Sequence, residues 1–165
     1  MFFKKKEQKN DNKKMELKAF VSGKVIPIEQ VEDEVFSSKA LGDGLAIEPE
    51  SGVICAPCDA VVSVLNDDMK HAVGLTLGNG AQILIHEGID TVNLQGEGFQ
   101  VYVKEGEHVK TGQKLLQFDA GLIQEKGYKK TCILVLTETE GISHINCISG
   151  MDAIQGETVI IEMEK

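Results

Sequence analysis

The sequence predicts an all-β protein of one domain, a sandwich or barrel with one or two short helical turns. Two observations predict this class. Glycine is frequent, at 17 residues, while proline is scarce, at 3, and short apolar runs are separated by the Gly, Asn and Asp clusters that mark turns between strands. No segment keeps the 3.6-residue apolar period of a helix over ten or more residues. A chain of 165 residues is about one domain long and large enough to bury its own core.

The expected elements follow in order along the chain. Residues 1–15 form a tail rich in Lys and Asn, with the composition of a disordered segment, and residues 16–165 form the domain. Apolar runs bounded by turn residues predict strands, at 17–22, 24–28, 44–48, 52–55, 60–65, 71–77, 81–86, 99–103, 114–118, 131–136 and 158–163. Helical turns are expected at 29–33 and 120–126.

Charge and composition narrow the function classes. The formal net charge is −9, and because the tail is basic, the domain itself is strongly acidic. Nucleic-acid phosphates repel such a surface, which instead suits a protein that meets its partners through a local patch. The sequence has no secretory signal and no apolar run near the roughly 20 residues of a membrane span. We therefore expect a cytoplasmic protein that binds no nucleic acid and is peripheral to a membrane at most.

The four cysteines, Cys55, Cys58, Cys132 and Cys147, are expected to be free thiols in a reducing compartment. Cys55 and Cys58 have the spacing of a redox or zinc motif. A second such pair is missing, however, and the motif interrupts a strand-like stretch. Both residues are therefore expected to be thiols in or near the core.

The segment 71–90 holds the residues best suited to chemistry. Asn79-Gly80 between two apolar runs is a strong signal for a two-residue hairpin turn. Because directly paired residues point to the same side of a sheet, this turn places one set of side chains on one face: His71, Val73, Leu75, Leu84 and His86. His71 then lies diagonal to His86, within reach of its ring. A three-residue loop would instead shift the register by one and separate the two histidines.

Two adjacent imidazoles suit phosphoryl transfer, metal binding or acid–base chemistry. A metal site normally needs three or four ligands, and only Asp90 is fixed nearby, so neither a permanent metal nor a cofactor is expected. The sequence leaves one alternative open, a zinc ion shared between the two histidines and a carboxylate of a partner. His108 and His144 lie in polar stretches and are expected at the surface.

Four segments carry a resemblance to a known family: GDGLAIEPESGVICAP, KHAVGLTL, ILIHEGIDTVNLQGEGF and VKEGEHVKTGQKLLQFD. From about residue 16 to its end, the chain resembles the glucose-family enzyme IIA proteins of the bacterial phosphoenolpyruvate-dependent sugar phosphotransferase system. The resemblance implies an antiparallel β-sandwich that works as a phosphotransferase component through a phosphohistidine. It also implies two partners, the phosphocarrier protein HPr as donor and a IIB domain of a sugar permease as acceptor.

The resemblance also implies roles for single residues. His86 matches the histidine that accepts the phosphoryl group on Nε2, and His71 matches the second histidine of the site. Gly88 matches a glycine whose carbonyl orients the ring of that second histidine, and Asp90 matches an acidic residue beside the site. An apolar rim for docking partners is expected at Val73, Leu75 and Leu84.

Two positions depart from the family pattern. Met69 stands where a threonine is common, and methionine lacks the hydroxyl with which threonine can bond the phosphoryl group or a ring. Glu87 stands where an apolar residue usually follows the acceptor, and it is expected to add negative charge at the docking edge.

Two other functions compete with a phosphocarrier. The Gly-x-x-Val-x-x-Gly rhythm of VKEGEHVKTGQKLLQF is typical of biotinyl or lipoyl carrier domains, but the candidate lysine, Lys70, precedes that stretch instead of following it. The alternative with more weight is a regulatory binding module that acts on its targets through its phosphorylation state.

Overall fold

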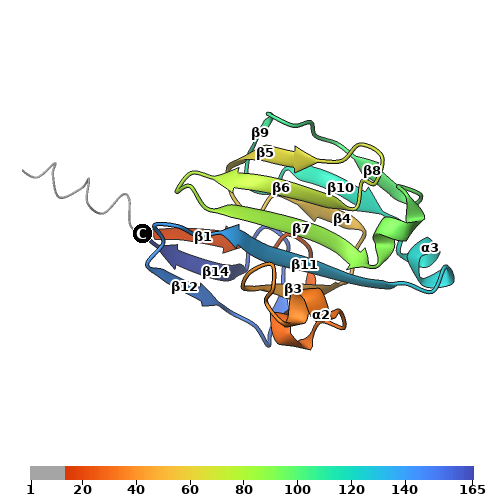
Figure 1. Ribbon diagram of the computed structural model, residues 1–165, viewed down its shortest axis with the longest axis horizontal. Helices are drawn as coiled ribbons and strands as arrows, with labels where there is room; N and C mark the ends of the chain where they lie inside the picture. The colour runs from red at the N-terminus through yellow and green to blue at the C-terminus, as the bar shows by residue number, and fades with distance from the viewer. Residues whose placement is uncertain (1–13) are drawn as a thin grey trace, which may run out of the picture.

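The computed structural model describes residues 14–165, which form an antiparallel β-sandwich (Figure 1). The predicted all-β class is confirmed. The strands are β1 (Lys14–Lys18), β2 (Gly23–Pro27), β3 (Gly44–Pro49), β4 (Val53–Cys55), β5 (Ala60–Leu65), β6 (Ala72–Leu77), β7 (Gln82–Ile89), β8 (Phe99–Val101), β9 (His108–Val109), β10 (Lys114–Phe118), β11 (Lys129–Glu138), β12 (His144–Cys147), β13 (Asp152–Ala153) and β14 (Val159–Glu164). The helical turns are η1 (Ile28–Gln30), α2 (Glu34–Ser37), η2 (Thr91–Leu94) and α3 (Ala120–Glu125).

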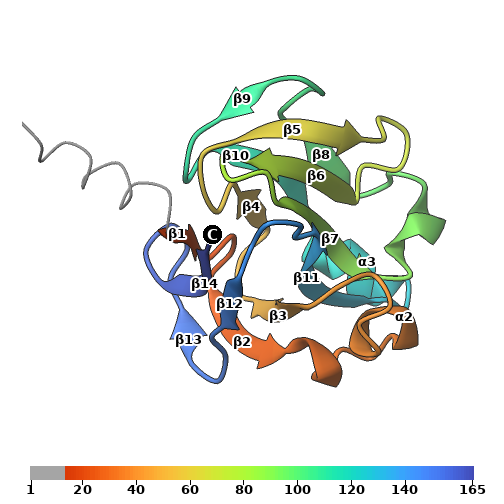
Figure 2. The same ribbon diagram turned by 60° about the vertical axis from the view of Figure 1, so that its left-hand side comes forward.

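The strands form one large and two small sheets. The large sheet has eight strands in the order β13-β2-β3-β11-β7-β6-β5-β9. A three-stranded sheet, β4-β10-β8, covers one of its faces, and Figure 1 shows β4 and β10 behind β6. The third sheet, β1-β14-β12, lies at one end of the molecule in both views (Figure 2).

Apolar side chains are buried on both faces of the large sheet. The main core lies on its inner face, against the small sheets, and includes Leu45, Leu134 and Leu116. A second cluster on the outer face packs Ile133 and Ala46 under the helical turns η1 and α2, with Phe36 at its edge. Because β3 and β11 are buried on both faces, their sequences are nearly continuous apolar runs rather than alternating ones.

Several predicted boundaries were wrong. The strand expected at 17–22 runs from Lys14 to Lys18, where polar and apolar residues alternate and only Leu17 is fully buried. Of the predicted tail, residues 1–13 lie outside the part that the structure describes, but Lys14 and Met15 belong to β1. Three strands of two to four residues, β9, β12 and β13, were missed because such short elements leave little pattern in a sequence. The turns α2 and η2 were also missed, so residues 14–165 hold four helical turns where one or two were expected.

The predicted register of the β6–β7 hairpin was also wrong. The loop has three residues, 78–80, and the Leu77 N–H donates to the Ala81 carbonyl at 2.8 Å. His86 therefore pairs with Ala72 instead of Val73. This shift of one residue places Val73 and Leu75 in the core and leaves His86 and Leu84 on the outer face.

The remaining predictions concern exposure and the thiols. His108 and His144 are exposed, as predicted. All four cysteines are free, and burial is the main cause that raises the pKa of Cys55 to about 11 and of Cys58 to about 12, so neither is an activated thiol. None of the helical segments within residues 14–165 has the length and apolar character of a membrane span.

Candidate active site

His86 lies on the outer face of the large sheet, at the edge of the second apolar cluster. Its neighbour across the sheet is Ile133 of β11. The ring of Phe36, from α2, lies 5.0 Å from the His86 ring between centroids, tilted by 59°. The strand therefore fixes the backbone of His86, and an aromatic side chain from a distant segment covers one side of its ring.

A backbone carbonyl fixes the proton of the His86 ring. The distance from Nδ1 to the Gly88 carbonyl oxygen is 2.9 Å. Because a carbonyl can only accept, Nδ1 carries the hydrogen, and the lone pair of the neutral ring is at Nε2. Gly88 makes this contact from a left-handed backbone conformation, with φ of +85°, and a Cβ there would collide with the side chain of Thr91.

The His86 ring is neutral at physiological pH. Burial is the main cause that lowers its pKa to about 4, and neighbouring His71 lowers it further. The Gly88 carbonyl and the Asp33 carboxylate act in the opposite direction. A neutral ring with a free Nε2 is the nucleophilic form of histidine.

His71 meets His86 by a different route from the predicted one. It lies just before β6, and Lys70 ahead of it has a positive φ of 61°, so the alternation of a strand does not fix its side chain. Its ring stands edge-on to His86, with 4.6 Å between centroids and 84° between planes. Its carbonyl accepts the Glu87 N–H at 2.8 Å. The two rings thus lie together despite the wrong register.

His71 is also kept largely uncharged. Burial is the main cause that lowers its pKa, and the Met69 backbone partly opposes this. Its Nδ1 is buried without a well-aligned hydrogen-bond partner among the described residues, and the Met69 backbone is the group whose hydrogen bonding raises its pKa. Nε2 is then the nitrogen of His71 available to a ligand at the site.

The Gly88 carbonyl contacts a different histidine from the predicted one. Its carbonyl was expected to orient His71, but it bonds to His86. The three-residue loop explains the difference, because it sets Glu87 opposite His71 where the two-residue turn would have set Gly88.

The predicted docking rim was wrong in two of its three residues. Val73 and Leu75 are fully buried in the main core, whereas Leu84 is half-buried on the same face as His86. Sequence reasoning missed the exposed apolar residues of the two short helices near the site. These are Val35 of α2, 51% exposed, and Val92 of η2, 43% exposed.

The acidic residue that acts on His86 is Asp33. Its side chain caps α2 by accepting from the Val35 N–H at 2.9 Å, and its charge raises the pKa of His86. Asp90 is exposed and begins η2 in a left-handed conformation, with φ of +64°. It is not among the groups that shift His86. Asp33 was missed because 53 positions of sequence separate it from His86.

Glu87 does not lie at a docking edge. Its side chain points to the inner face of β7 and is 0% exposed, because residues alternate along a strand and His86 takes the outer face. Both carboxyl oxygens lack a hydrogen-bond partner within residues 14–165. The prediction that Glu87 adds charge to the surface was therefore wrong.

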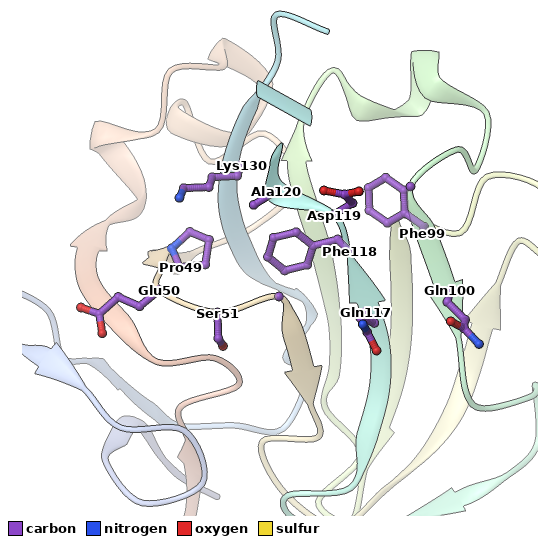
Figure 3. Close-up of a pocket in the computed structure, with 12 residues that line it drawn as sticks. Pro49, Glu50, Ser51, Phe99, Gln100, Gln117, Phe118, Asp119, Ala120 and Lys130 are labelled. Carbon is purple, nitrogen blue, oxygen red and sulfur yellow. The ribbon is translucent and has the colours of Figure 1, made fainter. Parts of the chain in front are cut away.

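A cavity of about 550 Å³ opens elsewhere, near the β3–β4 turn and the start of α3. Figure 3 shows it lined by Phe99, Phe118, Asp119 and Lys130, among others, and neither histidine lines it. No three His, Cys, Asp or Glu side chains of the described chain gather as a metal-binding group. The histidine pair is thus separate from this cavity.

Comparison with known proteins agrees with this arrangement. Residues 15–142 match the family model of the phosphoenolpyruvate-dependent sugar phosphotransferase system, EIIA 1. The chain is 37% identical to the glucose-specific EIIA component of Oceanobacillus iheyensis, over 96% of this chain and 95% of that one. It is 38% identical to part of the glucose-specific EIICBA component of Staphylococcus carnosus, over 86% of this chain and 21% of that one. Glucose permease IIA from Mycoplasma capricolum superposes with a TM-score of 0.82 at 33% identity, over 92% of this chain and 97% of that one.

Proposed function

The chain belongs to the EIIA 1 family and is a phosphocarrier of the sugar phosphotransferase system; from this premise we propose that Nε2 of His86 is the atom that carries the phosphoryl group. HPr supplies the group as a phosphohistidine, and a IIB domain of a sugar permease accepts it. The EIICBA relative, in which the matching segment is part of one longer chain, supports a IIB domain as the acceptor.

One observation carries this assignment: the hydrogen bond from His86 Nδ1 to the Gly88 carbonyl. It holds the ring in a single tautomer, with the lone pair at Nε2. Together with a pKa lowered to about 4, mainly by burial, it keeps a nucleophile ready without a base to remove a proton. Catalysis then consists mainly of positioning and of stabilising charge during an in-line transfer.

The transfer balances without a metal ion. The Nε2 lone pair of His86 forms the new N–P bond while the P–N bond of the donor breaks, and that electron pair stays on the donor ring. The donor ring is protonated at its other nitrogen, so it leaves as neutral imidazole. His86 keeps its Nδ1 proton and becomes the cationic phosphorylated ring, which the Gly88 carbonyl stabilises.

His71 assists the transfer without carrying the group. Its ring is 4.6 Å from that of His86, and Nε2 is its available nitrogen. In the tautomer protonated at Nε2 it donates a hydrogen bond to the phosphoryl oxygens. Such a preorganised donor matters most while negative charge is redistributed.

The partners dock over the outer face around His86. Val35, Val92 and Leu84 supply apolar area, and Phe36 supplies an edge beside the acceptor ring. Asp33 and Asp90 supply negative charge, which favours a partner with a basic patch at this position. A docked partner excludes water and thereby protects the labile phosphoryl group from hydrolysis.

The test is phosphorylation of purified protein with phosphoenolpyruvate, enzyme I and HPr. The wild-type chain should gain one acid-labile phosphate, and His86→Ala should gain none. His108→Ala removes an exposed histidine outside the site and should load like wild type. Phosphate that persists in His86→Ala and maps to another residue would contradict the assignment.

A further inference from the structure

Glu87 is a buried acid fixed to the phosphorylation site by its backbone. Its N–H donates to the carbonyl of His71 at 2.8 Å, and its carbonyl accepts the hydroxyl of Thr91. The next residue, Gly88, holds the His86 ring. With the backbone bonded on both sides, the side chain remains on the inner face, where it is 0% exposed.

The surroundings of Glu87 favour its uncharged form. Neither carboxyl oxygen has a well-aligned hydrogen-bond partner in the described chain, and the donor that acts on it is the weakly donating Cys132 thiol, so an ionised group would be poorly stabilised. Burial is the main cause that raises its pKa well above the ordinary value, and Glu48 of β3 raises it further. Cys132 and Lys130 of β11 lower the pKa of Glu87. Lys130, however, lines the cavity in Figure 3 and makes no ion pair within residues 14–165.

Phosphorylation brings charge to the other side of the same strand. The phosphoryl group on His86 carries roughly two negative charges while the ring beneath it becomes cationic, so the site gains a net charge of about −1, and the neighbouring side chain of Glu87 points to the opposite face of the same strand. A protonated Glu87 adds no repulsion to this group. An ionised Glu87 repels it through a medium of low dielectric constant, where screening by salt is weak.

We propose that Glu87 is a positioning residue of the phosphoryl-transfer site, whose uncharged carboxyl permits His86 to carry the dianionic group and whose loss of a proton opposes phosphorylation. This inference rests on the proposed function of His86. By linkage the effect is reciprocal: phosphorylation of His86 makes the Glu87 proton harder to remove by the same factor. As the pH rises and Glu87 loses its proton, the equilibrium of phosphoryl exchange with HPr thus shifts away from phosphorylated His86.

The first experiment measures the equilibrium of phosphoryl exchange with HPr as a function of pH. It compares wild type, Glu87→Gln and Glu162→Gln, which removes an exposed carboxylate in β14. Gln at position 87 has the same shape and no proton to lose. At low pH the three proteins should load alike. At alkaline pH wild type and Glu162→Gln should load less than Glu87→Gln, by about tenfold or more.

Parallel curves for wild type and Glu87→Gln would overturn the inference and leave the proposed function intact. Failure of the wild-type chain to accept any phosphoryl group would overturn the proposed function and the inference together. The two failures are thus distinguishable in one data set.

A second experiment needs no variant in order to test the same linkage. Carboxyl ¹³C resonances of glutamate in the wild-type protein should include one, assigned to Glu87, that titrates far above the others. Its midpoint should rise by about one pH unit or more on phosphorylation of His86, matching a tenfold effect. A midpoint unchanged by phosphorylation, or an ordinary titration near pH 4.5, would overturn the inference.

Discussion

Strand β7 carries two neighbouring ionisable side chains, His86 and Glu87, on opposite faces of the large sheet. Both lose their charge for the same reason, because burial penalises the ionised form of a base and of an acid alike. The pKa of His86 is lowered to about 4 and that of Glu87 is raised well above its ordinary value. The two faces differ in what else they supply. The outer face gives His86 a carbonyl acceptor, and within residues 14–165 the inner face gives the Glu87 carboxyl no well-aligned donor, only the nearby Cys132 thiol.

This difference separates a buried group whose proton has a fixed place from one whose carboxyl lowers stability and acts only through its state of charge. Burial by itself makes a side chain neutral, but a hydrogen bond to a fixed atom also decides where its proton resides. In the proposed function His86 therefore presents a defined nucleophile, whereas the Glu87 carboxyl lies in the core without a well-aligned donor among the described residues. Each of the following changes alters one feature of one of these two regions.

The largest effect is expected from His71→Gln on the outer face. Loading from phospho-HPr should remain, because the nucleophile and its carbonyl anchor are intact. Unloading to IIB should slow by about 10²- to 10³-fold, as for the loss of one preorganised donor. Both half-reactions are measured on the same protein, with His144→Gln as a control at an exposed histidine. Unloading at the wild-type rate would show that His71 is a bystander.

Gly88→Ala should disturb the anchor of the outer face. Alanine at φ of +85° is strained, and its Cβ would collide with Thr91. We expect a loss of about 1–3 kcal/mol in the free energy of unfolding and slower loading, since the carbonyl that holds His86 must move. Gly80→Ala is a matched control, because it also has a positive φ, +92°, but its Cβ would meet open space. It should lose stability and still load at the wild-type rate.

Glu87→Leu should stabilise the inner face. Replacing an unpaired buried carboxyl with an apolar group removes a penalty of about 1–3 kcal/mol, which denaturant unfolding at neutral pH measures. The pKa of Glu87 is higher in the folded state than in the unfolded state. The contribution of this group to the free energy of unfolding of the wild type is therefore greatest below pH 4.5, and it falls as the pH rises towards the folded-state pKa. The gain should therefore be larger at pH 8 than at pH 5. An equal gain at both would mean that Glu87 does not titrate differently in the two states.

The smallest effect is expected from Met69→Thr. A hydroxyl beside His71 adds one hydrogen bond to a charged group, with an upper limit of about 1.5–3 kcal/mol. We expect a transfer rate raised by a few-fold in single-turnover measurements. An unchanged or lower rate would indicate that the site has adapted to methionine.

The sequence supported the fold class and the pairing of the two histidines better than it supported the local geometry. Strands such as β5 and β10 were predicted with their boundaries correct, because turn residues bound a regular apolar pattern. The hairpin register was not predictable with certainty, since Gly78 fits a strand end and a loop equally well. Phe36 and Asp33 were missed because only the packing of α2 on the large sheet brings them to His86.

The three-residue loop 78–80 has a consequence for how the protein tolerates change over generations. Side chains alternate between the two faces of a strand. The loss or gain of one residue in the loop therefore shifts the register between β6 and β7 by one, and every side chain of β7 then points to the opposite face of the sheet. Such a deletion alters no residue of the site, yet it exchanges His86 and Glu87 between solvent side and interior. We therefore expect the site to tolerate substitutions at residues 78–80 better than a change in the number of residues there.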